Sequence, residues 1–552
     1  MKTAYQSVEE ARIETGAVAG NTVAKRIYAF LERNELRVLG FVLLAITVSS
    51  LLCSYHKQLW LDEIFTIIVS SQPDLHHFFA AMPAEGNPPL NTFLTRLVIK
   101  AFGISQISVR LVPLAGFLTA LTGVYIFVRR EAGRVFGIVA VLLAIFGPAW
   151  RYSYEARPYG LLLGTFMLAL VGWQAATQIS DSHLERSRVP ALFCMALGIL
   201  GCAFSHYIGL IEIGVPLIVG EALRTYVRRR VDWPLVLTGL CCLPSLLVIV
   251  PMMRRTGNLI ISKSFILHGR LTLHKIYFYF KYAGKSWSLV MDNRIIVFAI
   301  VIALVTWAPF ARKWSRPYIS DAAGGVRTYV LWASFAASLL IPVTWLALFY
   351  GNGWYYCRYG IGAALGIVIW LCLILARRQI RSPELVAAIV IVVGAQYVAR
   401  LAGELRPGPV DNGLGDIVSY LDLGGIELIK DHPSNLPVVI SNAFHFPGIW
   451  WYASAAEKPR VVFLSSPDNA TEINASGVRA EKLYFHAPIL DFDSFISQTP
   501  HFLLEVDENS LGNPQLDSRK RLESDGFDVK MIDSKDHFTL FDVSRREPPS
   551  AP

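Results

Sequence analysis

The sequence predicts a polytopic α-helical membrane protein that carries a small α/β domain at its C-terminal end. Hydrophobic residues make up 53% and charged residues only 17% of the 552 residues, whereas a soluble domain carries about a quarter charged residues. The apolar residues lie in long runs between Val38 and Leu401, and most runs reach the ~20 residues that a spanning helix needs. After Leu401 these runs stop, and shorter strand-like and helix-like segments follow.

The charge of the chain changes sign near Glu404. From that residue onward there are 13 Lys/Arg and 23 Asp/Glu, against 38 and 19 before it. A basic membrane region meets anionic head groups, and an acidic region suits a soluble environment. All seven cysteines lie between Cys53 and Cys372, so disulfides do not hold the acidic region together.

Eleven spanning helices are expected. The first, Val38–Tyr55, follows a mixed and polar stretch, so it is interpreted as a retained helix and not as a cleaved signal peptide. The others are Val109–Val128, Val135–Trp150, Pro158–Gln174, Pro190–Ser205, Tyr207–Leu223, Trp233–Met253, Ile295–Phe310, Tyr329–Tyr350, Tyr359–Ala376 and Leu385–Leu401.

Lys and Arg in the short connections predict the orientation of these helices. One set of connections is basic, and the N-terminal tail with Lys25-Arg26 falls on the same side, which is expected to be the cytoplasm. The basic connections contain Arg129-Arg130, Arg186/Arg188, Arg228-Arg229-Arg230, Arg312-Lys313 and Arg377-Arg378. The chain then divides into a cytoplasmic tail (1–37), a transmembrane domain (38–402) with a first external loop (56–108), and an extracytoplasmic domain (403–552). A multi-pass protein of the cell (inner) membrane is expected.

Two further segments complete the predicted fold. Pro88–Gly103 is too short to span; its apolar residues share one helical face and its polar residues the other, which predicts an amphipathic helix in the membrane interface, capped by Asn87. The tail predicts a small α/β domain without a glycine-rich phosphate loop or metal-ligand spacing. Its expected strands are Val438–Ser441, Val461–Ser465, Phe502–Val506 and Phe538–Val543, and its expected helices are Asp491–Ser497 and Leu516–Ser524.

The first external loop begins with an acidic pair, Asp62-Glu63. An isolated pair of this kind is usually a solvated helix start, because acids favour helix N-termini. Here Trp60 and Leu61 precede the pair and an apolar stretch from Ile64 follows it, which favours a role beyond solubility. Adjacent side chains on a helix point about 100° apart, so only one of the two carboxylates can face a ligand directly.

Glu155 is a second acidic residue, and topology puts it on the same outer face. It lies in a tyrosine-rich stretch from Tyr152 to Gly160. It either pairs with Arg157 and closes the loop, or it belongs to a sugar-sized surface, to which tyrosine offers a ring and a hydroxyl.

Basic residues concentrate in one further stretch of the predicted outer face. From Arg254 to Lys285 the chain holds seven basic residues and no acidic one. This stretch either adheres to anionic lipid head groups or forms a phosphate site. Arg358, at the outer end of a later helix, is either an anchor or part of a phosphate clamp, for which its fork geometry is suited. Glu212 lies within a span, where a charged residue usually faces a cavity or a partner.

Five short motifs, in this order, resemble the polyprenol-phosphate-dependent glycosyltransferases of the GT-C class. The chain is most similar to the bacterial branch of the protein O-mannosyltransferase family, which includes the lipid A aminoarabinose transferases. The likeness covers roughly residues 38–400. Its motifs are Trp60-Leu61-Asp62-Glu63, Asn87-Pro88-Pro89-Leu90, Gly103-Ile104-Ser105 leading to Arg110-Leu111, Tyr154-Glu155-Ala156-Arg157-Pro158-Tyr159, and Arg358-Tyr359. Many relatives have His where this chain has Asn87, a poor ligand for transition metals, so no metal is expected there.

The resemblance implies that a sugar moves from a polyprenyl-phosphate donor to an acceptor hydroxyl on a glycan, lipid or protein, with inversion of the anomeric centre. Asp62 is the expected general base, and Glu63 and Glu155 would orient it or hold sugar hydroxyls. Tyr159 and Tyr359 are expected to bind substrate. The departing phosphate is expected to bind the cations Arg110, Arg157, Lys281, Lys285 and Arg358. No cofactor and no nucleic-acid partner is expected, and dependence on a divalent metal is left open.

Two functions of other classes are alternatives. A transporter or flippase for a lipid-linked or anionic glycan usually has broken helices and ionisable residues near the membrane midplane, whereas here the ionisable residues concentrate at outer helix ends. A non-catalytic scaffold would leave the loops around Asp62, Glu155 and Arg358 without a purpose.

Overall fold

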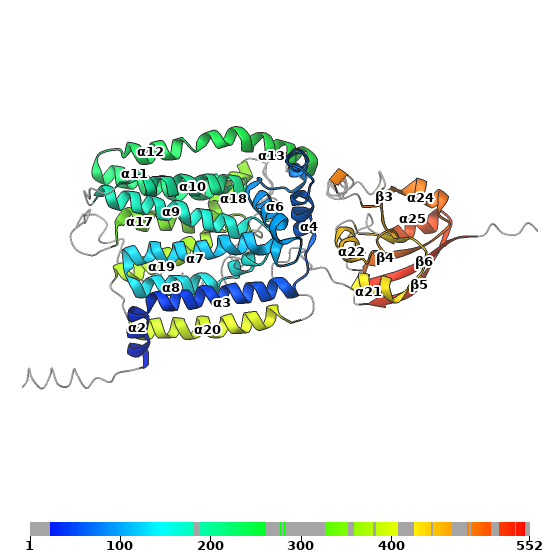
Figure 1. Ribbon diagram of the computed structural model, residues 1–552, viewed down its shortest axis with the longest axis horizontal. Coiled ribbons are helices and arrows are strands. Elements are labelled where there is room, and N and C mark those ends of the chain that lie inside the picture. Colours follow the sequence, from blue (N-terminus) through cyan, green and yellow to red (C-terminus); the bar gives the residue numbers. More distant parts are fainter. Residues whose placement is uncertain are drawn as a thin grey trace, which may run out of the picture.

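The chain forms a helical bundle followed by a smaller α/β domain. The computed structural model describes residues 23–181, 187–260, 277, 281, 326–350, 358–378, 382–406, 424–442, 445–465, 483–484, 487–508, 518–535 and 537–546. Figure 1 shows the α/β domain beside the end of the bundle that carries α4 (Leu61–Ser70) and α6 (Leu90–Phe102).

The expected spans within the described residues coincide with helices, some of them interrupted; the expected span Ile295–Phe310 lies outside these residues. The helices of the bundle are α2 (Val23–Arg33), α3 (Glu35–His56), α4, α5 (Leu75–Ala81), α6, α7 (Leu111–Ala132), α8 (Arg134–Phe146), α9 (Tyr159–Asp181), α10 (Val189–Ser205), α11 (Gly209–Arg228), α12 (Trp233–Leu240), α13 (Leu246–Ile260), α17 (Thr328–Ser338), α18 (Leu340–Tyr350), α19 (Gly362–Arg377) and α20 (Pro383–Glu404).

Several of these helices are suited to crossing a membrane. In the described part of the chain, five are long and apolar enough to span, or six if α17 and α18, which meet at a 53° bend, form one broken span. The shorter apolar helices are α8, α10 and α19. The chain is therefore a multi-pass membrane protein, while the count of eleven spans stays a prediction.

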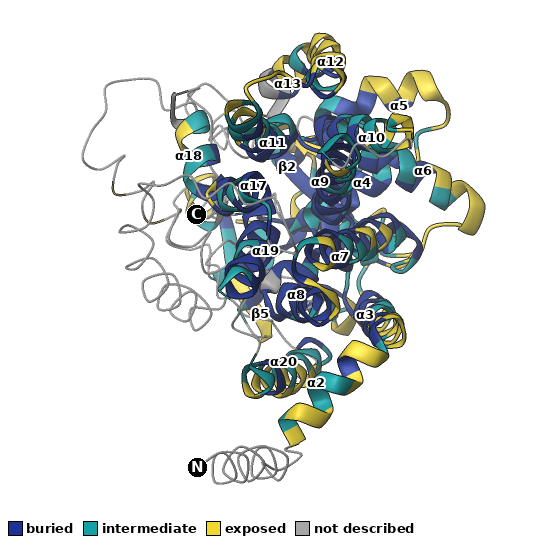
Figure 2. Ribbon diagram, turned by 90° about the vertical axis from the view of Figure 1, so that its left-hand side faces the viewer, coloured by how far each residue is buried: buried dark blue, intermediate teal, exposed yellow. Residues whose placement is uncertain are grey.

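The core of the bundle is formed by helices that are apolar on nearly every side. Figure 2 shows α7, α8, α9 and α19 mostly buried, with exposed residues on peripheral helices such as α5 and α12. Two glycines let α7 and α9 touch backbone to backbone: a Cβ at Gly116 would lie 2.4 Å from the Cα of Leu161, and one at Gly164 would lie 2.4 Å from the carbonyl of Gly116. Small residues at such crossings are how membrane helices pack closely.

The amphipathic segment folds as α6, as expected, but its start differs. The helix begins at Leu90 with Pro89 in the capping position, so the expected cap by Asn87 is wrong. The residue before a proline is disfavoured in the helical region, and two prolines follow Asn87, so the helix starts after them. Its polar residues Asn91 and Arg96 are buried against the protein, while Phe102 is exposed, an orientation that suits a helix in the membrane interface.

The α/β domain is built on one six-stranded sheet of order β3-β2-β1-β4-β6-β5. The first four strands are parallel, and β6 and β5 are antiparallel to their neighbours. The strands are β1 (Val438–Ile440), β2 (Val461–Ser465), β3 (Ile489–Asp491), β4 (His501–Asp507), β5 (Phe527–Lys535) and β6 (Phe538–Arg545). The four expected strands are confirmed. Strands β3 and β5 were not predicted because both are edge strands with mostly exposed side chains, so neither has a buried run of residues.

Helices cover both faces of this sheet. Buried side chains of α21 (Gly424–Asp431) and α22 (Phe446–Tyr452) pack on one face. Those of α24 (Phe492–Gln498) and α25 (Ser518–Ser524) pack on the other. The sheet therefore fixes α22 through its buried residues Phe446 and Ile449.

Candidate active site

The acidic pair lies at the start of α4, at the bundle end that faces the α/β domain. The Glu63 carboxylate accepts a hydrogen bond from the backbone N–H of Trp60 at 3.2 Å, which closes the first turn. The two carboxylates point apart, as adjacent helical positions require. Glu63 is fully buried, whereas the Asp62 side chain is 25% exposed.

Glu63 forms a buried ion pair with Arg110. Arg110 Nε and Nη2 donate to the two Glu63 oxygens at 2.8 and 2.7 Å, and the Ala156 N–H donates to the same carboxylate at 2.6 Å. Arg110 also donates to the carbonyls of Ser54, Lys57 and Gln58. These contacts engage all five N–H groups that an arginine has, so the pair ties α4 to the end of α3, the start of α7 and the loop of Glu155.

Asp62 instead faces two other arginines. Its Oδ2 lies 3.1 Å from Nη2 of Arg358 and 3.5 Å from Nη2 of Arg157. Arg157 is buried and Arg358 is largely so, with a side-chain exposure of 15%. The sequence-predicted residues Asp62, Arg157 and Arg358 therefore meet in one place.

Glu85 belongs to the same cluster, and sequence reasoning missed it. Its Oε1 accepts hydrogen bonds from Arg157 Nη1 at 3.0 Å and from the Thr66 hydroxyl at 2.9 Å. Burial, helped by the Asp62 charge, raises the pKa of Glu85 to about 7, although Arg157 and Thr66 oppose the shift. In the sequence Glu85 is an isolated acid two residues before Asn87, so little marks it as a site residue.

Glu155 lies nearby without pairing with Arg157. Its side chain is half-buried and has no hydrogen bond or ion pair to the described residues, while Arg157 pairs with Glu85 and Asp62. Burial and the Glu63 charge raise the pKa of Glu155 to about 7 against the attraction of Arg358 and Arg157. The site thus holds a carboxylate that titrates near neutral pH and is available to a ligand.

Aromatic rings line the cationic side of the cluster. The Arg358 guanidinium lies 5.6 Å from the Trp60 ring centre and 5.5 Å from that of Tyr159. His206, which sequence reasoning also missed, lies between Tyr159 and Tyr359, at ring distances of 5.5 and 5.0 Å. Burial and the two arginines lower the pKa of His206 to about 3. Its Nδ1 accepts from the Ile208 N–H, so Nε2 carries the proton and is a neutral donor.

Glu212 fixes the turn that follows Arg358. Its carboxylate accepts hydrogen bonds from the N–H groups of Gly360 at 2.9 Å and Gly362 at 3.3 Å. It therefore caps the start of α19 from α11. Gly360 has a φ of 83°, a value that favours glycine, and the resulting turn presents Arg358 to Asp62.

No family model and no curated protein matches the chain. Among solved structures, the chain is similar to ArnT from Cupriavidus metallidurans bound to undecaprenyl phosphate. The TM-score is 0.51 at 13% identity, over 91% of this chain and 98% of that one. The chain has the GT-C fold. ArnT in the apo state gives a TM-score of 0.43 at 13% identity over 91% and 97% of the two chains. The Archaeoglobus fulgidus oligosaccharyltransferase gives 0.43 at 12% over 91% and 73%. The likeness to GT-C proteins expected from the motifs is confirmed at the level of the fold.

Two of the expected phosphate ligands, Lys281 and Lys285, belong to the basic stretch of the sequence. Lys285 lies outside the described residues, as does most of the basic stretch after residue 260. Lys281 is exposed, and no contact joins it to the described site residues. Their role stays a prediction.

A group of metal-ligand atoms lies at the start of α5. Among the described residues, one group of three such atoms comes within 4.8 Å of one another: Asp74, His76 and His77. All three are exposed, and Asp74 already caps α5 by accepting the His77 N–H at 2.8 Å. This arrangement is that of an ordinary helix start.

Proposed function

We propose that this protein is a membrane glycosyltransferase that moves a sugar from a polyprenyl-phosphate donor to an acceptor hydroxyl at the outer face of the membrane. The observation that carries the proposal is the cluster of Asp62, Arg157 and Arg358, with Glu85 and Glu155 beside it. The GT-C fold and its neighbour ArnT, which was solved with undecaprenyl phosphate, support the choice of donor.

The donor phosphate would bind the cations that now hold Asp62. A phosphate leaving group is already an anion, so it needs positive charge more than it needs a strong acid. Arg358 offers a planar fork and lies over the rings of Trp60 and Tyr159, and the His206 Nε2–H adds a neutral donor. When phosphate oxygens take these donors, Asp62 is released from them.

Released Asp62 would then act as the general base. The acceptor oxygen attacks the anomeric carbon and gives its proton to Asp62, while the bond from that carbon to the phosphate oxygen breaks and the phosphate keeps the electron pair. The sugar passes through an oxocarbenium-like state that nearby carboxylates stabilise. A single displacement inverts the anomeric centre.

Glu155 is the rival for the base. Its pKa of about 7 lies near the operating pH, where general bases are most effective. In the main proposal Glu155 and Glu85 instead hold sugar hydroxyls and stabilise the developing positive charge. Tyr159 and Tyr359 supply flat apolar surface for the sugar or the lipid phosphate.

Glu63 and Arg110 are assigned a positioning role. Their hydrogen bonds are directed to each other and to the backbone, so they hold α4 in place and do not touch substrate. This assignment replaces the expectation that Arg110 binds the donor phosphate.

The deciding experiment incubates membranes that contain the protein with a panel of radiolabelled polyprenyl-phosphate sugars and identifies the labelled product. Asp62→Asn is the inactive control, because it keeps the shape of the side chain and removes the base. Label that becomes covalently attached to an acceptor only with the wild-type protein supports a transferase. Absence of a new covalent product with every donor would refute it.

A transporter or flippase is the second candidate, and the broken helix α17–α18 with its 53° bend is the observation that favours it. Its signature is different: labelled lipid-linked sugar would change leaflets in reconstituted vesicles without forming a new bond, and Asp62→Asn would have no chemical step to remove.

A further inference from the structure

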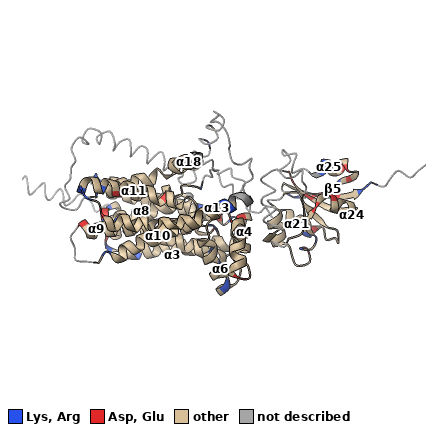
Figure 3. Cartoon of the chain, turned by 90° about the horizontal axis from the view of Figure 1, so that it is seen from above, with Lys and Arg blue, Asp and Glu red and all other residues tan. Residues whose placement is uncertain are grey.

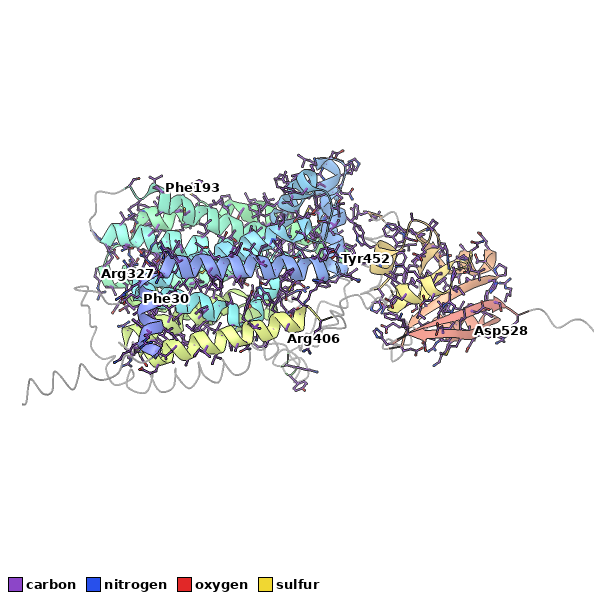
Figure 4. The ribbon with its side chains drawn as sticks, turned by 60° about the horizontal axis from the view of Figure 1, so that its bottom comes forward. Phe30, Phe193, Arg327, Arg406, Tyr452 and Asp528 are labelled. Atoms are coloured by element: carbon purple, nitrogen blue, oxygen red, sulfur yellow. The ribbon has the colours of Figure 1, made fainter. Side chains whose placement is uncertain are left out.

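Hydrogen bonds of two tyrosines, Tyr452 and Tyr484, join the α/β domain to the loop that carries Asp62, and the Tyr452 hydroxyl also bonds the Gln106 side chain. The Leu59 N–H donates to the Tyr452 hydroxyl oxygen at 2.7 Å, and the Tyr484 hydroxyl donates to the Ala80 carbonyl at 3.0 Å. Leu59 lies just before α4, and Ala80 lies in α5. Figure 4 labels Tyr452 at the border between the helical bundle and the α/β domain.

Apolar packing surrounds the first of these contacts. Trp451 and Tyr452, at the end of α22, pack against the buried cluster that includes Leu59 and Ile64. The other end of α22 is fixed in its own domain, because Phe446 and Ile449 are buried against the sheet. The Tyr452 hydroxyl is therefore a fixed acceptor and not the tip of a free side chain.

The Leu59 N–H needs this acceptor. The residue is only 2% exposed, it lies between the end of α3 and the start of α4, and a buried N–H without a partner destabilises the fold. Trp60, next along the chain, forms the N-cap of α4 and lies under Arg358. The entry into α4 thus sets both the direction of Asp62 and the ring on which Arg358 rests.

From this geometry we propose that Tyr452 is a positioning residue: the α/β domain holds the entry of α4 through the Leu59 N–H, and so sets Asp62 against Arg358. The inference rests on the proposed function for its effect on the rate. A displacement of about 1 Å at a reacting group can cost 10²-fold in rate, so a single hydroxyl far from the substrate is enough to matter.

The test uses Tyr452→Phe in the full-length protein, which removes the hydroxyl and keeps the ring in the apolar cluster. The matched control is Tyr55→Phe, the same change at an exposed tyrosine just before this segment. Two readouts are taken: kcat and donor KM, and hydrogen–deuterium exchange of the peptide that covers residues 57–66. Thermal unfolding confirms that both variants are folded.

We expect Tyr452→Phe to lower kcat about tenfold, to leave the donor KM within about twofold, and to speed exchange in 57–66, while Tyr55→Phe changes none of these. Exchange equal to that of the control overturns the proposal, whether or not any donor is turned over. Faster exchange with an unchanged kcat also overturns it, because the entry of α4 would then move without consequence. A failure of the wild-type protein to transfer any sugar would count against the proposed function alone, and the exchange result would still decide whether Tyr452 holds the loop.

Discussion

Asp62 and Arg358 lie 296 positions apart in the chain, yet Asp62 Oδ2 and Arg358 Nη2 are separated by 3.1 Å. Two buried carboxylates bring them together. Glu63, buried against Arg110, fixes the start of α4, and Glu212 fixes the turn before α19. The candidate base and the candidate phosphate ligand are therefore each held by a neighbouring buried carboxylate that has its own set of donors.

Replacing Asp62 with Asn should abolish transfer. General base catalysis commonly contributes 10²–10⁴-fold, so a loss of at least 100-fold in kcat is expected, with normal membrane insertion and donor binding. Labelled product per minute and donor binding are measured on the same preparation. A loss smaller than about tenfold rejects Asp62 as the base, and an inactive Glu155→Gln would then move the assignment to Glu155.

Glu63→Gln should act mainly on stability. Removing the charge of one member of a buried ion pair strands the other, at a cost of about 3–5 kcal/mol, and here the side chains are 0% and 1% exposed. A marked fall in melting temperature is expected, with partial recovery in the double variant Glu63→Gln, Arg110→Gln. The control is Glu427→Gln, from an exposed pair with Lys535, which should cost at most about 1 kcal/mol. Equal melting temperatures for the two single variants would contradict the assignment.

Arg358→Lys should weaken use of the donor although the charge is kept. Lysine lacks the planar fork that binds two phosphate oxygens and stacks poorly on rings, so we expect the donor KM to rise about tenfold with the acceptor KM unchanged. Arg229→Lys, at the opposite end of the bundle, is the control. Lys281→Ala and Lys285→Ala should shift the same parameter. If the donor KM stays unchanged in Lys281→Ala and Lys285→Ala, the basic stretch is assigned general adhesion to lipid instead.

The rate of transfer should rise with pH through about 7. The pKa of Glu155 is raised from its ordinary 4.5 to about 7, so the carboxylate that stabilises the sugar is mostly neutral below this pH and ionised above it. Glu155→Gln should flatten that part of the profile, and any remaining slope belongs to Glu85, whose pKa is similar. A profile of Glu155→Gln identical to wild type would contradict the role of Glu155.

The same shift predicts how stability depends on pH. The unfolded carboxylate ionises near 4.5 and the folded one only near 7, so the contribution of Glu155 to stability is complete below 4.5 and is lost as the pH rises to about 7. Thermal melts between pH 4.5 and 7.5 should show a smaller fall for Glu155→Gln than for wild type.

Reporter fusions test the topology. With the N-terminus inside and the α/β domain outside, a periplasm-active reporter fused after Arg400 should be active and one fused after Arg130 silent. The opposite result would invert the orientation. Figure 3 shows Lys and Arg residues at the bundle end distant from the α/β domain, where α11 ends, as expected for a cytoplasmic face.

Long-range geometry limited what sequence reasoning could find in the site. Asp62, Arg157 and Arg358 were predicted because each sits in a recognisable motif at an outer helix end. Glu85 and His206 sit in no such motif, and their importance comes from burial beside Arg157 and Tyr159. Glu212 was recognised as unusual, but its role as a cap needed the backbone of Gly360, 148 residues away.

The sequence by itself determined the features that local polarity encodes: the apolar runs, the amphipathic α6, the four strands of the α/β domain whose side chains are mostly buried, and the order of the acidic and basic loops. These follow from side-chain polarity at spacings of two to four residues. Only the tertiary structure decided which charges pair. It placed Arg110 on Glu63, Arg358 on Asp62 and Tyr452 at the entry of α4, because hydrogen bonds act over about 3 Å and the partners come from segments far apart in the chain.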